Sequence, residues 1–468
     1  MILYLIYIEP LLVKLGQVLK GLNIDTFDEV DNDFCDDVEI LVEDEADLLR
    51  AEEIFVMFEQ FSGARLNRSH KSKILGIGSS VGKMDWPLPW LKVETSLKIF
   101  GIYIYPTFQE TLKKNWEILI KNFRDTVFSW NLRSLDSFQQ KIDVLQIFGM
   151  SKLWYQCQVL PLPTQFAKQL ETIVRKFLWR GKLEKLALDE VKNSREEGGL
   201  NLVCIMSKAD ALFLRQTCRL LANENFNCFK HIKFWIGSFL GDILPPMQGS
   251  LNQVLVPDYF VHLKDLFTKA HALEIIDIQN LDGVSCKEIY QDFTSTFPPP
   301  KVIYKFEDLP WNEIWTRLNF PVLRSELRDL MFMLIHNILP TRDRLARLGR
   351  RDDAECHEGD GLEDAEHLFT SCIRTQVAWA WARRKIQNLL PEAEVYPSNF
   401  ELLHLAFNVN TMEKEIVWLI SSYCFYVWDL KRRKGNRFSV DVDKLRSYLM
   451  KEYVEIQFTQ NYLHIIPF

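Results

Sequence analysis

Two spacings of apolar residues divide this 468-residue chain. Near the amino terminus, short apolar runs alternate with polar residues at 27–30 and 38–42, which predicts β-strands. From about Glu110 onward the apolar residues recur at every third or fourth position, the spacing of an amphipathic helix. The pattern therefore predicts an α+β fold whose strands lie near the amino terminus and whose remainder is mostly helical.

The two predicted strands flank a short acidic segment, Phe34-Cys35-Asp36-Asp37, which indicates a β-hairpin with adjacent carboxylates at its turn. Like charges at close range raise each other's pKa, and a divalent cation would relieve their repulsion. Paired carboxylates suit a two-metal phosphoryl-transfer site, whose ions lie roughly 3.5–4 Å apart. An acidic surface turn is the alternative interpretation. An amphipathic helix is predicted to follow at 47–61.

The order of motifs around this hairpin resembles the reverse transcriptase of non-LTR (LINE-type) retrotransposons. Residues 34–37 are similar to that family's Tyr-Ala-Asp-Asp box, with conservative changes at the first two positions. Further similar motifs occur in the family's order before and after the hairpin: Tyr7-Ile8-Glu9-Pro10-Leu11-Leu12, Phe61-Ser62-Gly63, Leu66-Asn67, Lys71-Ser72-Lys73, Leu97 to Ile102, Phe177-Leu178-Trp179-Arg180-Gly181, Gly198-Gly199-Leu200, Leu339-Pro340-Thr341-Arg342 and Glu366-His367-Leu368-Phe369.

The resemblance implies an RNA-directed DNA polymerase, a nucleotidyltransferase of a transposable element, in which Asp36 and Asp37 bind Mg²⁺ and carry catalysis. Asn67 and Lys71 would shape the nucleotide side of the site, and Gly101 with its strand would support the primer. In the family a third metal-binding Asp and the fingers lie upstream of this hairpin. Because the resemblance begins at the helix just before the hairpin, we expect a truncated polymerase, inactive alone.

The domain organisation follows from the resemblance and from helical periodicity. A partial palm is expected at 1–105, and a thumb-like helical domain at 106–225. A helical connector is expected at 226–300, where Pro298-Pro299-Pro300 marks a boundary. A helical region with a polar loop should occupy 301–395, and a carboxy-terminal helical region 396–468.

Basic residues gather in short runs although the net charge is −7. Lys and Arg dominate binding to nucleic-acid phosphates, and interleaved aromatic rings add base stacking. The run expected to bind nucleic acid contains Arg175, Lys176, Trp179, Arg180 and Lys182. By resemblance the partners would be element RNA and target DNA. A solvated helix face is the alternative for each run.

The polar loop at 350–364 carries a second candidate site. Cys356, His367 and Cys372 resemble the metal-binding knuckle near the end of LINE proteins, of the form Cys-x-x-Cys followed by His-x-x-x-x-Cys. Gly359 occupies the position of the second cysteine. Structural zinc requires four tetrahedral ligands, so the site would be weak unless His357 or a carboxylate such as Glu358 substitutes. The alternative is that these side chains pack without metal.

Composition limits the remaining choices. Hydrophobic content of 47% and aromatic content of 13% argue against disorder. Nine scattered cysteines favour a reducing compartment, so we expect an intracellular protein, cytoplasmic or nuclear and not secreted. No apolar run is long enough to predict a membrane span. Three hypotheses follow: a reverse-transcriptase fragment, a non-catalytic nucleic-acid-binding remnant, and an inert relic or protein-interaction scaffold. The sequence leaves the oligomeric state open.

Overall fold

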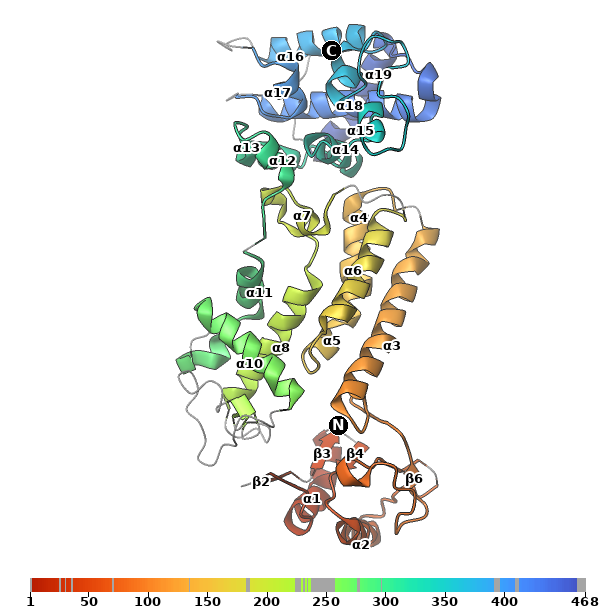
Figure 1. Ribbon diagram of the computed structural model, residues 1–468, viewed down its shortest axis with the longest axis vertical. Coiled ribbons are helices and arrows are strands. Elements are labelled where there is room, and N and C mark those ends of the chain that lie inside the picture. The colour runs from red at the N-terminus through yellow and green to blue at the C-terminus, as the bar shows by residue number, and fades with distance from the viewer. Residues whose placement is uncertain are drawn as a thin grey trace. The chain divides into compact units, whose positions relative to one another are not determined.

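The computed structural model describes most of the chain (Figure 1). Cys35 and Asp36 of the acidic hairpin and Lys182 of the basic run lie outside the described residues, as does the side chain of Asp37. The described residues are 2–24, 27–29, 31–34, 37–69, 71–133, 135–181, 186–223, 229, 232–233, 235–236, 257–275, 278–295, 297–390, 396–408 and 412–460.

The chain divides into two compact units, each built from several segments. The first contains Met1–Phe123, Lys152–Gln169 and Ile205–Ser295. The second contains Arg124–Ser151, Leu170–Cys204 and Thr296–Phe468. The change of unit after Ser295 falls beside the predicted proline boundary. The five-part division of the sequence stays a prediction.

The first unit holds the strands of the described chain, in two-stranded sheets. Strand β1 (Leu22–Ile24) pairs with β2 (Phe27–Glu29), and β3 (Asp31–Phe34) pairs with β4 (Asp37–Ile40), all antiparallel. The shorter pairs are β5 (Lys73–Ile74) with β6 (Lys92–Val93), parallel, and β7 (Leu97–Ile99) with β8 (Ile102–Ile104), antiparallel.

The acidic hairpin is therefore present, but its first strand is not the predicted one. The run at 27–30 was expected to pair with 38–42, whereas β3 is the partner of β4 and β2 turns back onto β1. The register Phe34↔Asp37 leaves a two-residue connection. The alternation rule found both apolar runs, but it did not recognise the polar strand Asp31–Phe34, because strands with few apolar residues lack that signal.

Two helices flank the strands of this hairpin. Helix α1 (Ile2–Val18) packs against α2 (Glu45–Ser62), which starts two residues before the predicted helix and is capped by the Asp44 carboxylate. Capping fits here because the first backbone N–H groups of a helix lack partners within it. The apolar face shared by the two helices consists of Ile8, Leu11, Leu15, Leu19, Ala51 and Ile54.

The rest of the first unit is helical, as the periodicity predicts. Its main core joins α8, α10 and α11 through buried residues such as Phe213, Leu263, Phe267 and Ile289. The helices that lie wholly or partly in this unit are α3 (Phe108–Ser129), α5 (Trp154–Cys157), α6 (Thr164–Leu178), α8 (Ile205–Leu221), α10 (Asp258–Ala272) and α11 (Cys286–Thr294), with 3₁₀ turns η1 (Gly78–Ser80) and η7 (Ile278–Gly283).

The second unit is built from helices and short turns around α18 (Glu413–Lys434), whose residues from Glu415 to Cys424 are all buried. Its other elements are α4 (Phe138–Asp143), α7 (Leu188–Lys192), α12 (Lys301–Lys305), α13 (Trp311–Leu318), α14 (Ser325–Ile335), α15 (Arg342–Arg347), α16 (Gln376–Leu389), α17 (Asn399–Leu403) and α19 (Val442–Gln460), together with turns η2 (Trp130–Leu132), η3 (Val144–Gly149), η4 (Met150–Lys152), η5 (Arg195–Glu197), η8 (His367–Ser371) and η9 (Gly435–Arg437).

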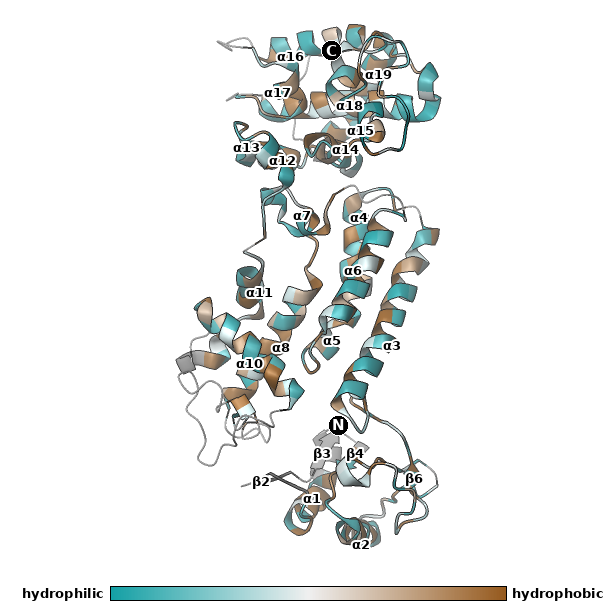
Figure 2. Cartoon of the chain, viewed as in Figure 1, coloured by the Kyte–Doolittle hydropathy of each residue, from teal (hydrophilic) through white to brown (hydrophobic). Residues whose placement is uncertain are grey.

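Hydropathy agrees with this helical packing. Hydrophilic and hydrophobic residues alternate along α3 and α6, as amphipathic helices require (Figure 2). Across the described residues, no helix combines the length and the apolar character needed to cross a bilayer.

Candidate functional site

The base of the acidic hairpin segment is held by one buried carboxylate. Asp47, on the first turn of α2, accepts hydrogen bonds from the backbone N–H groups of Lys20 (3.0 Å), Gly21 (3.3 Å) and Glu43 (3.3 Å). Arg50 donates a fourth at 2.6 Å. Lys20 and Gly21 precede β1, and Glu43 follows β4, so Asp47 closes the two ends of the segment 22–42.

Burial alone would raise the pKa of Asp47. The Arg50 guanidinium and the three backbone donors outweigh burial and hold that pKa below its ordinary value. Asp47 is therefore a structural anion that holds the backbone of this segment.

The residues predicted to surround a nucleotide are exposed in the first unit. Asn67 accepts hydrogen bonds from the backbone and hydroxyl of Ser69, and Lys71 lies in the turn that follows. Gly101 follows Phe100 in the tight turn between β7 and β8, where both residues have positive φ (44° and 85°). Such turns favour glycine because it carries no Cβ. The roles of these three residues stay predictions.

The basic run lies at the end of α6 and beyond, in the second unit. Arg175 is partly exposed and Lys176 and Arg180 are exposed, so their charges reach solvent. Trp179, however, is only 5% exposed and packs edge-on against Phe138, with ring centroids 5.4 Å apart. The expectation of base stacking by this ring is wrong for this conformation. The burial of Trp179 leaves phosphate contact as the available mode.

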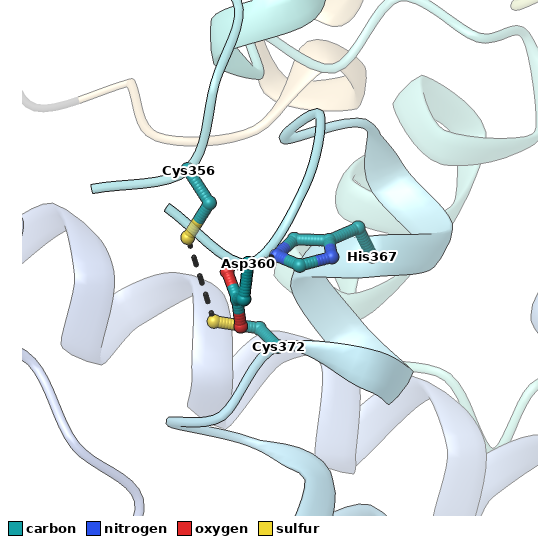
Figure 3. Close-up of side chains that lie close together, drawn as sticks. All are labelled: Cys356, Asp360, His367 and Cys372. Atoms are coloured by element: carbon teal, nitrogen blue, oxygen red, sulfur yellow. Dashed lines mark hydrogen bonds and ion pairs between the residues drawn. The ribbon is translucent and has the colours of Figure 1, made fainter. Parts of the chain in front are cut away.

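The structure brings together the knuckle residues, and a fourth residue joins them (Figure 3). Cys356, Asp360, His367 and Cys372 each place one ligand atom within 4.8 Å of the other three. The sulfurs of Cys356 and Cys372 lie 3.7 Å apart. Oδ1 of Asp360 lies 3.1 Å from Nε2 of His367.

A closed loop presents two of these groups. Glu355 and Leu362 form an isolated antiparallel bridge, and the backbone N–H of Cys356 donates to the Gly361 carbonyl at 2.7 Å. This loop contains Cys356 and Asp360 on its two arms. The backbone N–H of Ile373 donates to Oδ2 of Asp360 at 2.8 Å, so the loop is joined to the segment that carries Cys372.

A short helical segment presents the other two groups. The Asp364 carboxylate accepts from the backbone N–H of His367 at 2.8 Å, as an N-cap does three residues ahead. The π turn η8 then spans His367–Ser371, and the N–H of Cys372 donates to the His367 carbonyl at 2.9 Å. The imidazole and the second thiol therefore face the loop from one turn.

Burial sets the electrostatics of this cluster. It raises the pKa of the Cys356 thiol to about 12 and raises that of Cys372, and in both cases the carboxylate of Asp360 adds to the rise. Burial would also raise the pKa of Asp360, but the N–H of Ile373 and the thiol of Cys356 lower it overall. Without a cation the cluster holds two neutral thiols beside one carboxylate.

Charged side chains fasten the loop to the rest of the second unit. Arg374 binds the carboxylate of Glu358 and the carbonyl of Asn436 in η9. Glu363, on the loop, is buried and pairs with Lys431 of α18. Neither residue that the sequence offered as a fourth metal ligand belongs to the cluster. Glu358 pairs with Arg374, and His357 is exposed.

Sequence reasoning missed Asp360. The family's spacing placed the second ligand at Gly359, and Asp360 is one residue beyond it. A signal was present nonetheless, because an Asp between Gly359 and Gly361, four residues after a cysteine, offers a carboxylate oxygen in a loop that can bend.

Comparison with known proteins gives one partial similarity. The chain is 27% identical over 226 residues to the Transposon TX1 uncharacterized 149 kDa protein of Xenopus laevis. The matched segment is 47% of this chain and 17% of that protein, so the chain spans a minor part of its relative. No family model matches the sequence. The chain is therefore similar to a transposon protein.

Proposed function

We propose that this chain is part of a retrotransposon RNA-directed DNA polymerase, and that its 468 residues bind nucleic acid without extending a primer on their own. The observation that carries the proposal is the antiparallel pairing of β3 with β4, which joins Phe34 to Asp37 of the acidic segment. The similarity to a transposon protein supports the same assignment.

The chemistry expected at this hairpin is binding of Mg²⁺ by adjacent carboxylates. Mg²⁺ prefers oxygen ligands and usually acts through one or two carboxylates together with substrate phosphates. Asp36 and Asp37 supply two such ligands, held by a hairpin whose base is fixed by Asp47. The resemblance assigns the third carboxylate and the fingers to another segment, which is why these residues alone are proposed not to catalyse nucleotide transfer.

The nucleic-acid-binding part of the proposal rests on cations whose charge reaches solvent. Arg175, Lys176 and Arg180 carry their charge at the end of α6, and Arg180 also donates to the Leu135 carbonyl, which fixes its position. Because Trp179 is buried, contact is expected with phosphates and not with bases. Binding should then depend strongly on salt and weakly on sequence.

Primer extension on an RNA template with Mg²⁺ tests the catalytic half. The 468-residue chain should give no extension product, and neither should its Asp37→Asn variant. In a protein that also contains the upstream polymerase segments, extension should appear and Asp36→Asn or Asp37→Asn should abolish it. Extension that survives the double Asn change would show that the hairpin is not the metal site.

Charge reversal tests the binding half. The double change Arg175→Glu with Arg180→Glu should weaken binding of a single-stranded RNA and reduce the slope of log K against log salt by about 1–2, since about one unit is lost per phosphate contact. The matched control is Lys444→Glu with Lys451→Glu, two exposed lysines elsewhere in the second unit. Equal loss in both variants would contradict the assigned surface, because only net charge would then matter.

A further inference from the structure

We propose that Cys356, Asp360, His367 and Cys372 bind one zinc ion, with Asp360 supplying the ligand that a cysteine supplies in the knuckle the sequence resembles. The inference concerns the fold of the second unit and does not depend on catalysis by the hairpin. It rests on the geometry of four side chains (Figure 3).

The distances among the four groups match the edges of a zinc tetrahedron. Zn–S bonds of about 2.3 Å place two sulfur ligands about 3.8 Å apart, and Zn–N and Zn–O bonds of about 2.0–2.1 Å place nitrogen and oxygen about 3.3 Å apart. The observed separations are 3.7 Å between the Cys356 and Cys372 sulfurs and 3.1 Å between Asp360 Oδ1 and His367 Nε2.

The remaining pairs need only a small contraction. A sulfur and a nitrogen or oxygen ligand on one zinc lie about 3.6 Å apart. All ligand atoms of the cluster already lie within 4.8 Å of one another. The remaining pairs therefore have to close by about 1.2 Å at most.

An incompletely bonded imidazole nitrogen supports a ligand at this position. Nε2 of His367 is buried and makes no well-oriented hydrogen bond among the described residues, although Oδ1 of Asp360 is near it. Burying a polar atom without a hydrogen bond costs free energy. A metal ion between the imidazole and the carboxylate satisfies both groups.

Surrounding contacts hold the ligands in place, as outer-shell partners do at metal sites. The N–H of Ile373 occupies Oδ2 of Asp360, which leaves Oδ1 as a single donor toward the cluster. The hydroxyl of Ser371 lies 3.4 Å from Nδ1 of His367, so Nε2 is the nitrogen left for metal. Arg374 forms an ion pair with the carboxylate of Glu358, and Asp360 is the carboxylate that belongs to the cluster.

The donor set favours zinc over other common ions. Two thiolates exclude the hard cations Mg²⁺ and Ca²⁺, which require oxygen ligands. Two sulfurs, one nitrogen and one oxygen in a tetrahedron suit Zn²⁺, and Co²⁺ can replace it as a coloured probe. Because the ligands must lose protons and come from two chain segments, metal binding should also stabilise the second unit.

Cobalt titration of the full chain, metal-free and kept reduced, tests the proposal. One equivalent of Co²⁺ should produce the visible absorption of a tetrahedral ion and thiolate charge-transfer bands, and Zn²⁺ should displace it. Asp360→Ala removes a direct ligand and should therefore weaken metal binding by more than the roughly tenfold that loss of an outer-shell partner costs at such sites. Asp352→Ala, the matched control, removes an exposed carboxylate from the same polar loop and should leave the cobalt spectrum unchanged.

Asp360→Cys keeps the test decisive if the alanine variant folds poorly. A third thiolate should raise the charge-transfer intensity by about half, in proportion to the number of sulfur ligands. Stoichiometric binding with unchanged intensity in this variant would overturn the role of Asp360. Absence of a tetrahedral cobalt spectrum in the unmodified chain would overturn the metal site itself.

Discussion

Replacing Asp47 with alanine should open the base of the acidic hairpin segment. The carboxylate is fully buried and accepts from the backbone N–H groups of Lys20, Gly21 and Glu43 and from Arg50. Four hydrogen bonds to a charged acceptor, each contributing about 1.5–3 kcal/mol, would sum to about 6–12 kcal/mol.

The net cost should be smaller because water can replace part of this set. Lys20 and Glu43 are exposed and Arg50 is partly exposed, so their donors are rehydrated when the carboxylate is removed, whereas Gly21 is buried. We therefore expect Asp47→Ala to destabilise this region by about 3–5 kcal/mol, within the range for breaking a buried charged interaction. Asp47→Asn keeps one oxygen acceptor and should cost less.

Amide hydrogen exchange is the appropriate assay, because it reports local opening without requiring the two units to unfold together. In Asp47→Ala the amides of Gly21 and Glu43 should exchange roughly 100-fold faster or more, as a loss of about 3 kcal/mol implies. Asp44→Ala is the matched control, since it removes the α2 cap and an exposed ion pair with Lys20 but leaves the Asp47 carboxylate in place, and it should cost about 1 kcal/mol. An exchange rate at Gly21 within about threefold of the unmodified chain would refute the role assigned to the Asp47 carboxylate.

The stabilisation by the Asp47 carboxylate also has a defined dependence on pH. The pKa of Asp47 is lowered in the folded chain, so its contribution to stability is present above the ordinary Asp pKa. That contribution should be lost as the pH falls through the lowered folded pKa. The acid-induced opening should be absent from Asp47→Asn, whose side chain does not titrate.

Two further predictions concern the second unit. Burial raises the pKa of Asp329 to about 7, although its carboxylate accepts the Phe138 N–H at 2.7 Å, so the contribution of Asp329 to the free energy of unfolding should fall as pH rises from about 4 to 7. Urea denaturation across this pH range should show that Asp329→Asn abolishes the fall, and an unchanged pH slope in the variant would contradict this assignment. A Cβ on Gly198 (φ 82°) would lie 2.5 Å from the Trp315 ring, so Gly198→Ala should destabilise the unit by about 2–4 kcal/mol. Urea denaturation measures this change, and a loss below about 0.5 kcal/mol would be inconsistent with the packing.

Helices of this protein could be predicted closely from sequence, whereas one hairpin strand could not. The apolar spacing at 47–61 is carried by side chains that α2 buries, including Leu48 and Ile54, so the pattern and the packing have the same cause. Strand β3 is Asp-Asn-Asp-Phe, and its pairing with β4 depends on backbone hydrogen bonds that leave no trace in hydropathy.

The candidate sites show the same division. Burial of Trp179 could not be read from helical spacing, because Trp179 lies just beyond α6 and two residues after Phe177; its burial depends on packing against Phe138, which is distant in sequence. The sequence shows Asp360 as a carboxylate near the motif, but its approach to His367 depends on how the loop between Glu355 and Leu362 folds back, which no fixed spacing records. The structure thus adds one carboxylate to the three residues that the motif named.

Equilibrium binding of a primer–template RNA–DNA hybrid to the full chain, measured across a salt series, tests the proposed role most directly. If the chain is a nucleic-acid-binding part of a retrotransposon polymerase, log K should fall linearly with log salt, with a slope whose size reports several neutralised phosphates. The slope should shrink when Arg175 and Arg180 are reversed. No measurable binding at low salt would contradict the proposal and leave an inert scaffold as the remaining explanation.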